Sequence, residues 1–228
     1  SDGKLMTGAD ALTMVTLLEG LGADAIGVNC SLGPKALSPI VEDYLKYSSL
    51  PVILKPNAGL PKSQDGKTVY DILPDKFLSE VLPLVKNGVR IVGGCCGTTP
   101  EYIKKITENT KDILPVPTAK KDMTCVCSYT HSVVFSDKPV LIGERINPTG
   151  KKRLKQALAQ NDLDYILKEG IKQQESGADV LDVNVGLPEI DEEKMLKNVV
   201  CELQSVSDLP LQIDTSDISA METALRIY

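Results

Sequence analysis

Short apolar runs alternate along this 228-residue chain with longer segments in which apolar residues recur every three or four positions. The short runs predict β-strands, and the longer segments predict amphipathic helices. Strands are expected near 24–29, 51–55, 89–93, 140–144, 179–183 and 210–214, and helices near 9–20, 35–47, 75–87, 100–109, 151–159, 162–176, 191–206 and 216–227. Prolines stand at several expected helix starts and glycines just past several expected ends, namely Pro34, Pro74 and Pro100, then Gly22, Gly88 and Gly177. Regular alternation of strand and helix predicts parallel sheets joined by helical crossovers.

A weak internal repeat divides the chain. The octet at 22–29 is echoed at 177–184, and each copy is followed, after a helix, by a strand that begins with Leu-Pro. Gly-Ala-Asp is also common in connections between a helix and a strand, so the repeated octet alone could arise by chance. The Leu-Pro that follows both copies favours two related βα domains. Each half holds about three strand units, whereas a closed (βα)₈ barrel needs eight strands. We therefore expect an α/β chain of two incomplete (βα)₈ TIM-type barrels, a piece of a longer protein.

The expected domains follow from this division. Residues 1–112 are expected to form the C-terminal part of the first barrel, and 139–228 the N-terminal part of the second. Between them, 113–138 is rich in proline and polar residues and is expected to be an interdomain linker, with a possible short strand at 132–135. Half-barrels expose open sheet edges, so the piece alone is expected to be poorly stable, prone to aggregation and inactive.

Composition narrows the class of protein. The net charge is −6, the pI is about 5.0, and no block is rich in Lys or Arg, so neither nucleic acid nor a membrane surface is the expected partner. No apolar run is long enough to span a bilayer, and the N-terminus lacks the apolar core of a signal peptide. Six cysteines are too few for a secreted disulfide scaffold, which favours a cytoplasmic protein with reduced thiols.

Three of the cysteines stand at strand ends. Cys30 closes the run 25–30, and the adjacent Cys95 and Cys96 close the run 89–96. The carboxyl ends of barrel strands meet at one mouth, and three thiolates there can hold Zn²⁺ while leaving its fourth corner for a substrate. Glycines on both sides of the vicinal pair permit the sharp turn that two neighbouring ligands need. The alternative is that a buried cysteine is a small core residue, which is the better reading of Cys30 taken alone.

The other three cysteines and the histidine give weaker evidence for a functional site. Cys125 and Cys127 lie in the linker without a second pair of cysteines nearby, and Cys201 lies in a helix. We therefore expect none of the three to bind a metal or take part in catalysis. His131, the only histidine, also lies in the linker, which argues against a histidine base or zinc ligand.

The segments 27–31 (Gly-Val-Asn-Cys-Ser) and 93–98 (Gly-Gly-Cys-Cys-Gly-Thr) resemble the zinc-binding homocysteine S-methyltransferase domain, and 52–59 resembles the intervening strand and loop of that family. The resemblance implies Zn²⁺ on Cys30, Cys95 and Cys96, with the homocysteine sulfur at the fourth position. A coordinated thiol is deprotonated, which gives a thiolate nucleophile at neutral pH. Asn57 is expected at the same mouth, where it binds the polar end of the amino acid or simply forms a turn before Ala58-Gly59.

The segment 143–150 (Gly-Glu-Arg-Ile-Asn-Pro-Thr-Gly) resembles the opening of the pterin-binding domain that follows the homocysteine domain in the cobalamin-dependent methionine synthase family, and 182–186 and 212–216 resemble its next two strand ends. The donor-rich edge of a pterin is complementary to carboxylates and amides. The resemblance implies that Glu144, Asn147 and Asp214 face the pterin, with Asp182 and Asn184 nearby. Each acid could instead cap the following helix, Asp214 above all. The basic run 151–153 is expected to be a solvated face, or else to meet an acidic polyglutamate tail.

The order of the two domains implies methyl transfer. In such a synthase a methyl group passes from 5-methyltetrahydrofolate through cobalamin, bound on a module absent from this chain, to homocysteine, forming methionine. Two alternatives stay open at this point. One is a two-domain corrinoid or folate methyltransferase with another carrier or acceptor, and the other is a non-catalytic zinc or redox module.

Overall fold

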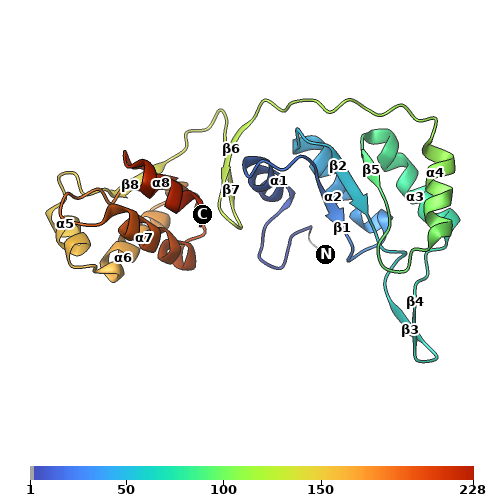
Figure 1. The fold of residues 1–228 in the computed structure, drawn as a ribbon, viewed down its shortest axis with the longest axis horizontal. Helices are drawn as coiled ribbons and strands as arrows, with labels where there is room; N and C mark the ends of the chain where they lie inside the picture. Colours follow the sequence, from blue (N-terminus) through green and yellow to red (C-terminus); the bar gives the residue numbers. More distant parts are fainter. Residues whose placement is uncertain (1–2) are drawn as a thin grey trace. The chain divides into compact units, whose positions relative to one another are not determined.

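The computed structural model describes residues 3–228, and the chain divides into two compact units, 1–122 and 123–228. Each unit combines helices with a parallel sheet, as the alternating pattern predicts (Figure 1). The six predicted parallel strands and eight helices are all present, with ends that differ by no more than two residues. Within the described residues, no helix is both long and apolar enough to cross a membrane.

Unit 1 is built on a parallel three-stranded sheet of order β1-β2-β5. Its strands are β1 (Ile26–Asn29), β2 (Val52–Lys55) and β5 (Ile91–Val92), and its helices are α1 (Ala11–Gly20), α2 (Pro34–Tyr47), α3 (Pro74–Asn87) and α4 (Pro100–Thr110). Val52 and Leu54 are buried against the helices, whereas Lys55 at the end of β2 is exposed. The sheet is therefore apolar on its helix-covered face, and its carboxyl ends lead into the loops that carry the cysteines.

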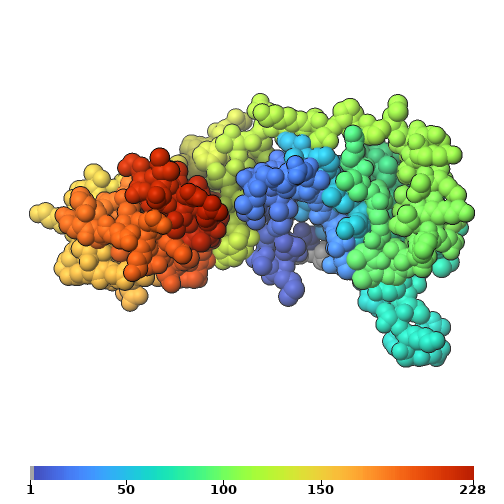
Figure 2. Space-filling model, in the orientation of Figure 1, coloured from blue at the N-terminus to red at the C-terminus, as the bar shows by residue number. Residues whose placement is uncertain are grey.

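A β-hairpin that the hydrophobic pattern did not predict projects from unit 1 (Figures 1 and 2). It pairs β3 (Lys62–Gln64) with β4 (Lys67–Val69) through a two-residue Asp65-Gly66 turn. Both turn residues have positive φ, 51° and 74°, as this tight hairpin turn requires. Asp-Gly between two short runs is itself a hairpin signal, but the strands are exposed and lack the apolar alternation that marks a buried strand.

Unit 2 holds a second parallel three-stranded sheet, of order β10-β9-β8. Its strands are β8 (Ile142–Ile146), β9 (Val180–Val183) and β10 (Leu211–Ile213), and its helices are α5 (Lys152–Ala159), α6 (Leu163–Glu175), α7 (Glu192–Val206) and α8 (Ile218–Leu225). Leu181 and Val183 of the central strand are fully buried in one core with Leu196 and Leu203 of α7. This core fixes the strand ends from which the second set of candidate residues extends.

The segment expected as a linker is partly structured. It contains an antiparallel hairpin of β6 (Thr124–Cys127) and β7 (Ser132–Phe135), which groups with unit 2. The possible strand at 132–135 is confirmed, and β6 was not predicted. The Ser128 hydroxyl donates to the carbonyl of Asp208, and the Tyr228 hydroxyl donates to that of Cys127, so long-range bonds attach the hairpin to the unit.

Candidate functional site

Three thiols from two separate loops converge in unit 1. The Sγ of Cys30 lies 3.7 Å from that of Cys96, which in turn lies 3.9 Å from the Sγ of Cys95. All three sulfur atoms lie within 4.8 Å of one another. The structure therefore brings together the three cysteines that the sequence pattern singles out, although 66 positions separate Cys30 from Cys96.

Backbone bonds between neighbouring strand ends hold the two loops together. The amide of Cys30 donates to the carbonyl of Lys55 at 2.9 Å, and the amide of Cys95 donates to that of Pro56 at 2.9 Å. Cys30 and Ser31 both adopt left-handed backbone conformations, with φ of 66° and 60°. Such conformations are costly for residues with a side chain and persist where surrounding structure holds them. Here they turn the chain sharply at the end of β1, beside the Cys95-Cys96 loop.

The thiols also influence one another electrostatically. Hydrogen bonding to the backbone of Ser31, and then to the Cys95 and Cys96 thiols, lowers the pKa of Cys30. The pKa of Cys95 is raised, and the largest cause is its hydrogen bond with Cys30. The thiol of Cys30 thus ionises more readily than an isolated cysteine, and that of Cys95 less readily.

The spacing of the sulfur atoms suits a zinc ion. Zinc–sulfur bonds of about 2.3 Å place two sulfurs of a tetrahedron about 3.8 Å apart. The observed separations of 3.7 and 3.9 Å bracket that value. A set of three protein ligands is typical of catalytic zinc sites, which keep the fourth position for a ligand that enters.

Asn57 is buried beside this cluster, with 4% of its surface exposed. Its Oδ1 accepts a hydrogen bond from the amide of Cys96 at 3.0 Å, and hydrogen bonding from its side chain helps to lower the pKa of Cys30. The residue thus connects the loops that carry the cysteines. Its expected contact with the amino acid stays a prediction.

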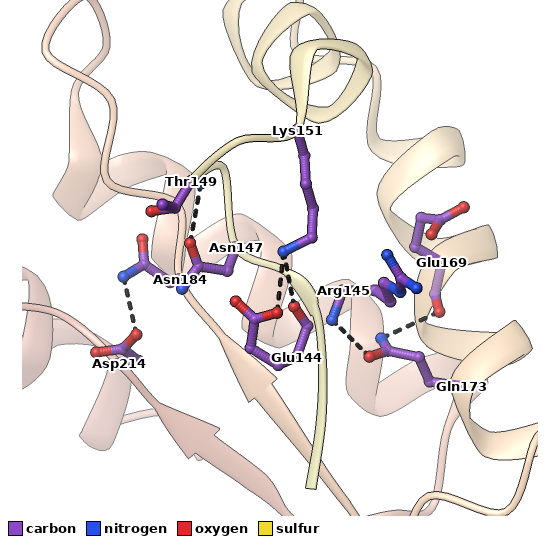
Figure 3. A network of polar contacts seen from close by, with 9 residues as sticks. All are labelled: Glu144, Arg145, Asn147, Thr149, Lys151, Glu169, Gln173, Asn184 and Asp214. Atoms are coloured by element: carbon purple, nitrogen blue, oxygen red, sulfur yellow. Dashed lines mark hydrogen bonds and ion pairs between the residues drawn. The ribbon is translucent and has the colours of Figure 1, made fainter.

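Polar side chains gather at the carboxyl ends of the strands of unit 2 (Figure 3). The Nδ2 of Asn184 donates to Asp214 at 2.9 Å, and its Oδ1 accepts from the amide of Gly186 at 2.9 Å. Asn147 accepts from the amide of Thr149 at 3.0 Å and shapes the turn after β8. Asp214 does not cap helix α8, because Asp217 fills that position. A hollow of about 800 Å³ is lined by Thr149, Asn184 and Gly186, whereas Asn147 and Asp214 are not among its lining residues.

Asp182 is the buried acid of this group. Burial, followed by the charges of Asp214 and Glu144, raises the pKa of its carboxyl, while a hydrogen bond from Gln212 at 2.8 Å acts in the opposite direction. Its exposed fraction is 5%. The structure therefore places three carboxylates close enough to repel one another, an arrangement that is unfavourable without a ligand or a cation to compensate it.

Lys151 supplies the cation, and the expectation of a solvated basic face is wrong for this residue. Its Nζ donates to the backbone oxygen and to the Oε2 of Glu144, both at 3.0 Å (Figure 3). The side chain is 23% exposed because it turns back over the strand end. Its neighbour Arg153 does face outward, where it pairs with Asp162. No local pattern distinguishes the first basic residue of the run from those that follow it.

Gln173 of α6 is a second residue that the sequence analysis missed. Its Oε1 accepts from the amide of Arg145 at 2.6 Å, and its Nε2 donates to the carbonyl of Glu169 (Figure 3). The bond lies where the pairing of β8 with β9 changes register, between Gly143 and Ile146. The side chain of Gln173 thus satisfies a backbone amide at this irregularity, next to Glu144.

The other cysteines lie in unit 2 and make no metal cluster within residues 3–228. Cys125 and Cys127 are on β6, where burial raises the pKa of Cys127 to about 11, and Cys201 is exposed on α7. A buried thiol with a raised pKa is unreactive.

Comparison with known proteins finds a separate family match for each part of the chain. Residues 1–110 match the family model described as Homocysteine S-methyltransferase, and residues 143–228 match the model described as Pterin binding enzyme. The chain is 31% identical over 233 residues to the methionine synthase of Mycobacterium leprae (strain TN), and 31% identical over 228 residues to that of Mycobacterium tuberculosis (strain ATCC 25618 / H37Rv). Each match covers 98% of this chain and 19% of the relative, so the chain spans about a fifth of the length of these relatives.

The order of the two matches is the order of the two sites along the chain. The chain is therefore similar to the homocysteine S-methyltransferase family in its first 110 residues and to the pterin-binding enzyme family from residue 143 onward, and nearly its whole length is similar to methionine synthases.

Proposed function

We propose that this chain carries the homocysteine site and the folate site of a cobalamin-dependent methionine synthase. The observation that carries the proposal is the sulfur trio, whose spacing fits one tetrahedral zinc ion with a position left for a substrate thiol. We infer that each three-stranded sheet is part of a (βα)₈ barrel whose mouth lies at the carboxyl ends of the strands. Residues 1–112 and 139–228 would then contribute to separate barrels, joined by 113–138.

In the first site, Cys30, Cys95 and Cys96 would hold the zinc ion. A zinc ion there would keep the sulfur of homocysteine ionised at neutral pH, ready to accept a methyl group. Asn57 accepts a hydrogen bond from the Cys96 amide, and its side chain would lie beside the polar end of the amino acid. The chain itself therefore binds and orients the methyl acceptor.

In the second site, Glu144, Asn147 and Asp214 would face the pterin ring of 5-methyltetrahydrofolate, with Asp182 and Asn184 beside them. The ring presents amino and ring N–H donors, and the carboxylates here are strong acceptors. Asn184 donates to one carboxylate oxygen of Asp214, and Lys151 donates to Glu144, so these two acids are ordered before a ligand enters. Cobalamin, supplied by another module, would carry the methyl group from this site to the first.

Zinc and thiol titrations of the 228-residue chain test the first site. We expect one zinc ion per chain, and release of about one proton when homocysteine is added to the zinc-loaded chain, since a coordinated thiol loses its proton. Cys30→Ser should abolish tight zinc binding, whereas Cys201→Ser, which removes an exposed cysteine far along the chain, should leave it unchanged. A zinc-loaded chain that ignores homocysteine would instead indicate a closed structural site.

Binding of methyltetrahydrofolate tests the second site. The fluorescence of the pterin ring reports binding directly, and we expect Asp214→Asn to weaken it at least tenfold because the ring loses an ionic acceptor. Asp208→Asn is the matched control, since Asp208 bonds to Gln174 and Ser128 and not to the residues proposed to face the pterin. Equal affinities for the two variants would contradict the assignment of Asp214.

A further inference from the structure

A β-bulge interrupts strand β8 at a residue of the second candidate site. Between Gly143 and Ile146 the strand carries two residues, whereas its partner β9 carries one residue over the same stretch. The two residues are Glu144 and Arg145. An extra residue on one strand bends that strand locally and changes the direction of a side chain, which is why bulges are common beside binding sites.

The bulge decides which side chains of β8 face the helices. In a regular strand the side chains alternate between two faces, so Glu144 and Ile146, two positions apart, would share one face. Ile146 is fully buried in the core together with Leu154 of α5. Glu144 is exposed, and its carboxylate accepts a hydrogen bond from Lys151. The extra residue therefore lets one short strand place an apolar side chain in the core and a carboxylate outside it.

Gln173 of α6 bonds to the backbone inside this bulge (Figure 3). Its Oε1 accepts from the amide of Arg145 at 2.6 Å, and its Nε2 donates to the carbonyl of Glu169 at 3.1 Å. The second bond fixes the direction of the first, because it holds the side-chain amide by its other end. With 7% of its surface exposed, Gln173 makes these bonds largely away from solvent.

Gly143 provides the space that the Gln173 side chain needs. A Cβ added to Gly143 would stand 2.7 Å from the Oε1 of Gln173 and 3.1 Å from its Cδ. The same Cβ would lie 3.3 Å from the Cβ of Ala178, so the neighbourhood is filled on that side too. Gln173 therefore contacts the positions directly before and directly after Glu144, and any side chain at 143 would displace it.

We propose that Gln173 is a positioning residue of the pterin site, which directs the carboxylate of Glu144 toward the pterin by holding the bulge around it. The inference rests on the proposed function, because it takes Glu144 as a contact of the pterin. A binding group that is already held in its bound direction loses less freedom when the ligand enters. Without the bond from the Arg145 amide to Gln173, the bulge is free to shift, and the carboxylate loses its fixed direction.

A double-mutant cycle separates positioning from general stability. Pterin fluorescence measures the affinity for methyltetrahydrofolate of the 228-residue chain with Gln173→Leu, with Glu144→Ala and with both substitutions. We expect each single substitution to weaken binding about tenfold, and the double variant to bind no more weakly than Glu144→Ala, because Gln173 acts through Glu144. Losses that simply add would overturn the inference, since a purely structural role weakens binding whether or not Glu144 is present.

Gln174→Leu is the matched control, since it removes the next glutamine of the same helix. Gln174 bonds to Asp208 and Ser207, so we expect a lower unfolding midpoint and an unchanged affinity for methyltetrahydrofolate. Equal losses of affinity in Gln173→Leu and Gln174→Leu would overturn the inference.

Two further outcomes distinguish this inference from the proposed function. If Glu144→Ala weakens binding and Gln173→Leu does not, the inference alone is wrong. If Glu144→Ala binds as tightly as the unsubstituted chain, the assignment of Glu144 to the pterin is wrong, and the inference is wrong with it. Should Gln173→Leu fail to fold, Gly143→Ala displaces the same side-chain amide and takes its place in the cycle.

Discussion

Replacement of Gly27 by alanine should separate β1 from β2 and disperse the sulfur cluster. Gly27 pairs with Ile53 in the parallel sheet, and a Cβ added to it would lie 2.1 Å from the Ile53 carbonyl oxygen and 2.6 Å from the Ile53 Cβ. Non-bonded heavy atoms ordinarily lie about 3.5 Å apart. To restore that separation between the added Cβ and the Ile53 oxygen, the strands would have to move apart by about 1.4 Å. The backbone of a central strand cannot give way as a flexible side chain does.

The expected cost follows from these contacts. Overpacking alone destabilises by about 1–3 kcal/mol. The movement also stretches the hydrogen bonds that flank Gly27, from Ile26 to Pro51 and from Cys30 to Lys55, each contributing about 1 kcal/mol. We therefore expect Gly27→Ala to lower the free energy of unfolding of unit 1 by about 3 kcal/mol or more. Because Cys30 follows β1 directly, zinc affinity should fall as well.

Urea unfolding, together with hydrogen exchange of peptides from each unit, measures this effect. The midpoint and the protection of β1 and β2 should fall, while β8 and β9 serve as an internal reference. Gly20→Ala is the matched substitution, since no atom lies within 4 Å of the added Cβ and alanine is favoured in a helix. If Gly27→Ala unfolded at the same urea concentration as Gly20→Ala and kept its zinc, the reasoning from close strand approach would be refuted.

Two further predictions concern unit 2. Asp182→Asn should raise the stability of this unit at pH 7 while weakening pterin binding. Burial raises the pKa of Asp182, so its stabilising contribution is fully present below the ordinary carboxyl range and is lost as the pH rises through the raised value. Thermal unfolding at pH 7 and at pH 3 should show the gain only at the higher pH, and a gain of equal size at both would contradict the assignment. Gln173→Leu should cost about 1–3 kcal/mol, because the amide of Arg145 loses its acceptor. Hydrogen exchange at that amide should accelerate, and unchanged protection would show that the bond is dispensable.

The sequence predicted most of the secondary structure because its signals are local. The prolines at 34, 74 and 100 stand at the first positions of α2, α3 and α4, and Gly88 ends α3 with φ of +128°. The β3-β4 hairpin and strand β6 were missed for a related reason. All three strands are short, β3 and β4 are largely exposed, and β6 is only partly buried, so the apolar alternation that marks a buried strand is absent.

The candidate sites were predictable as lists of residues at strand ends, but their internal contacts were not. Asn57 was expected to face the amino acid, and the structure shows its oxygen bonded to the Cys96 amide. Lys151 was grouped with a solvated basic run, and the structure turns it back onto Glu144. In each case the direction of the side chain depends on residues far away in the sequence or on the path of a loop.

The sequence by itself determined the order of strands and helices, the parallel arrangement and the positions of the two sets of chemical groups, because periodicity, prolines and glycines act within a few residues. Only the tertiary structure decided that Cys30 meets Cys96 at 3.7 Å and that Gln173 bonds to the backbone beside Glu144. Those contacts depend on strand register and on how closely two backbones can approach. Both are set by packing between segments that are distant along the chain, which no local pattern encodes.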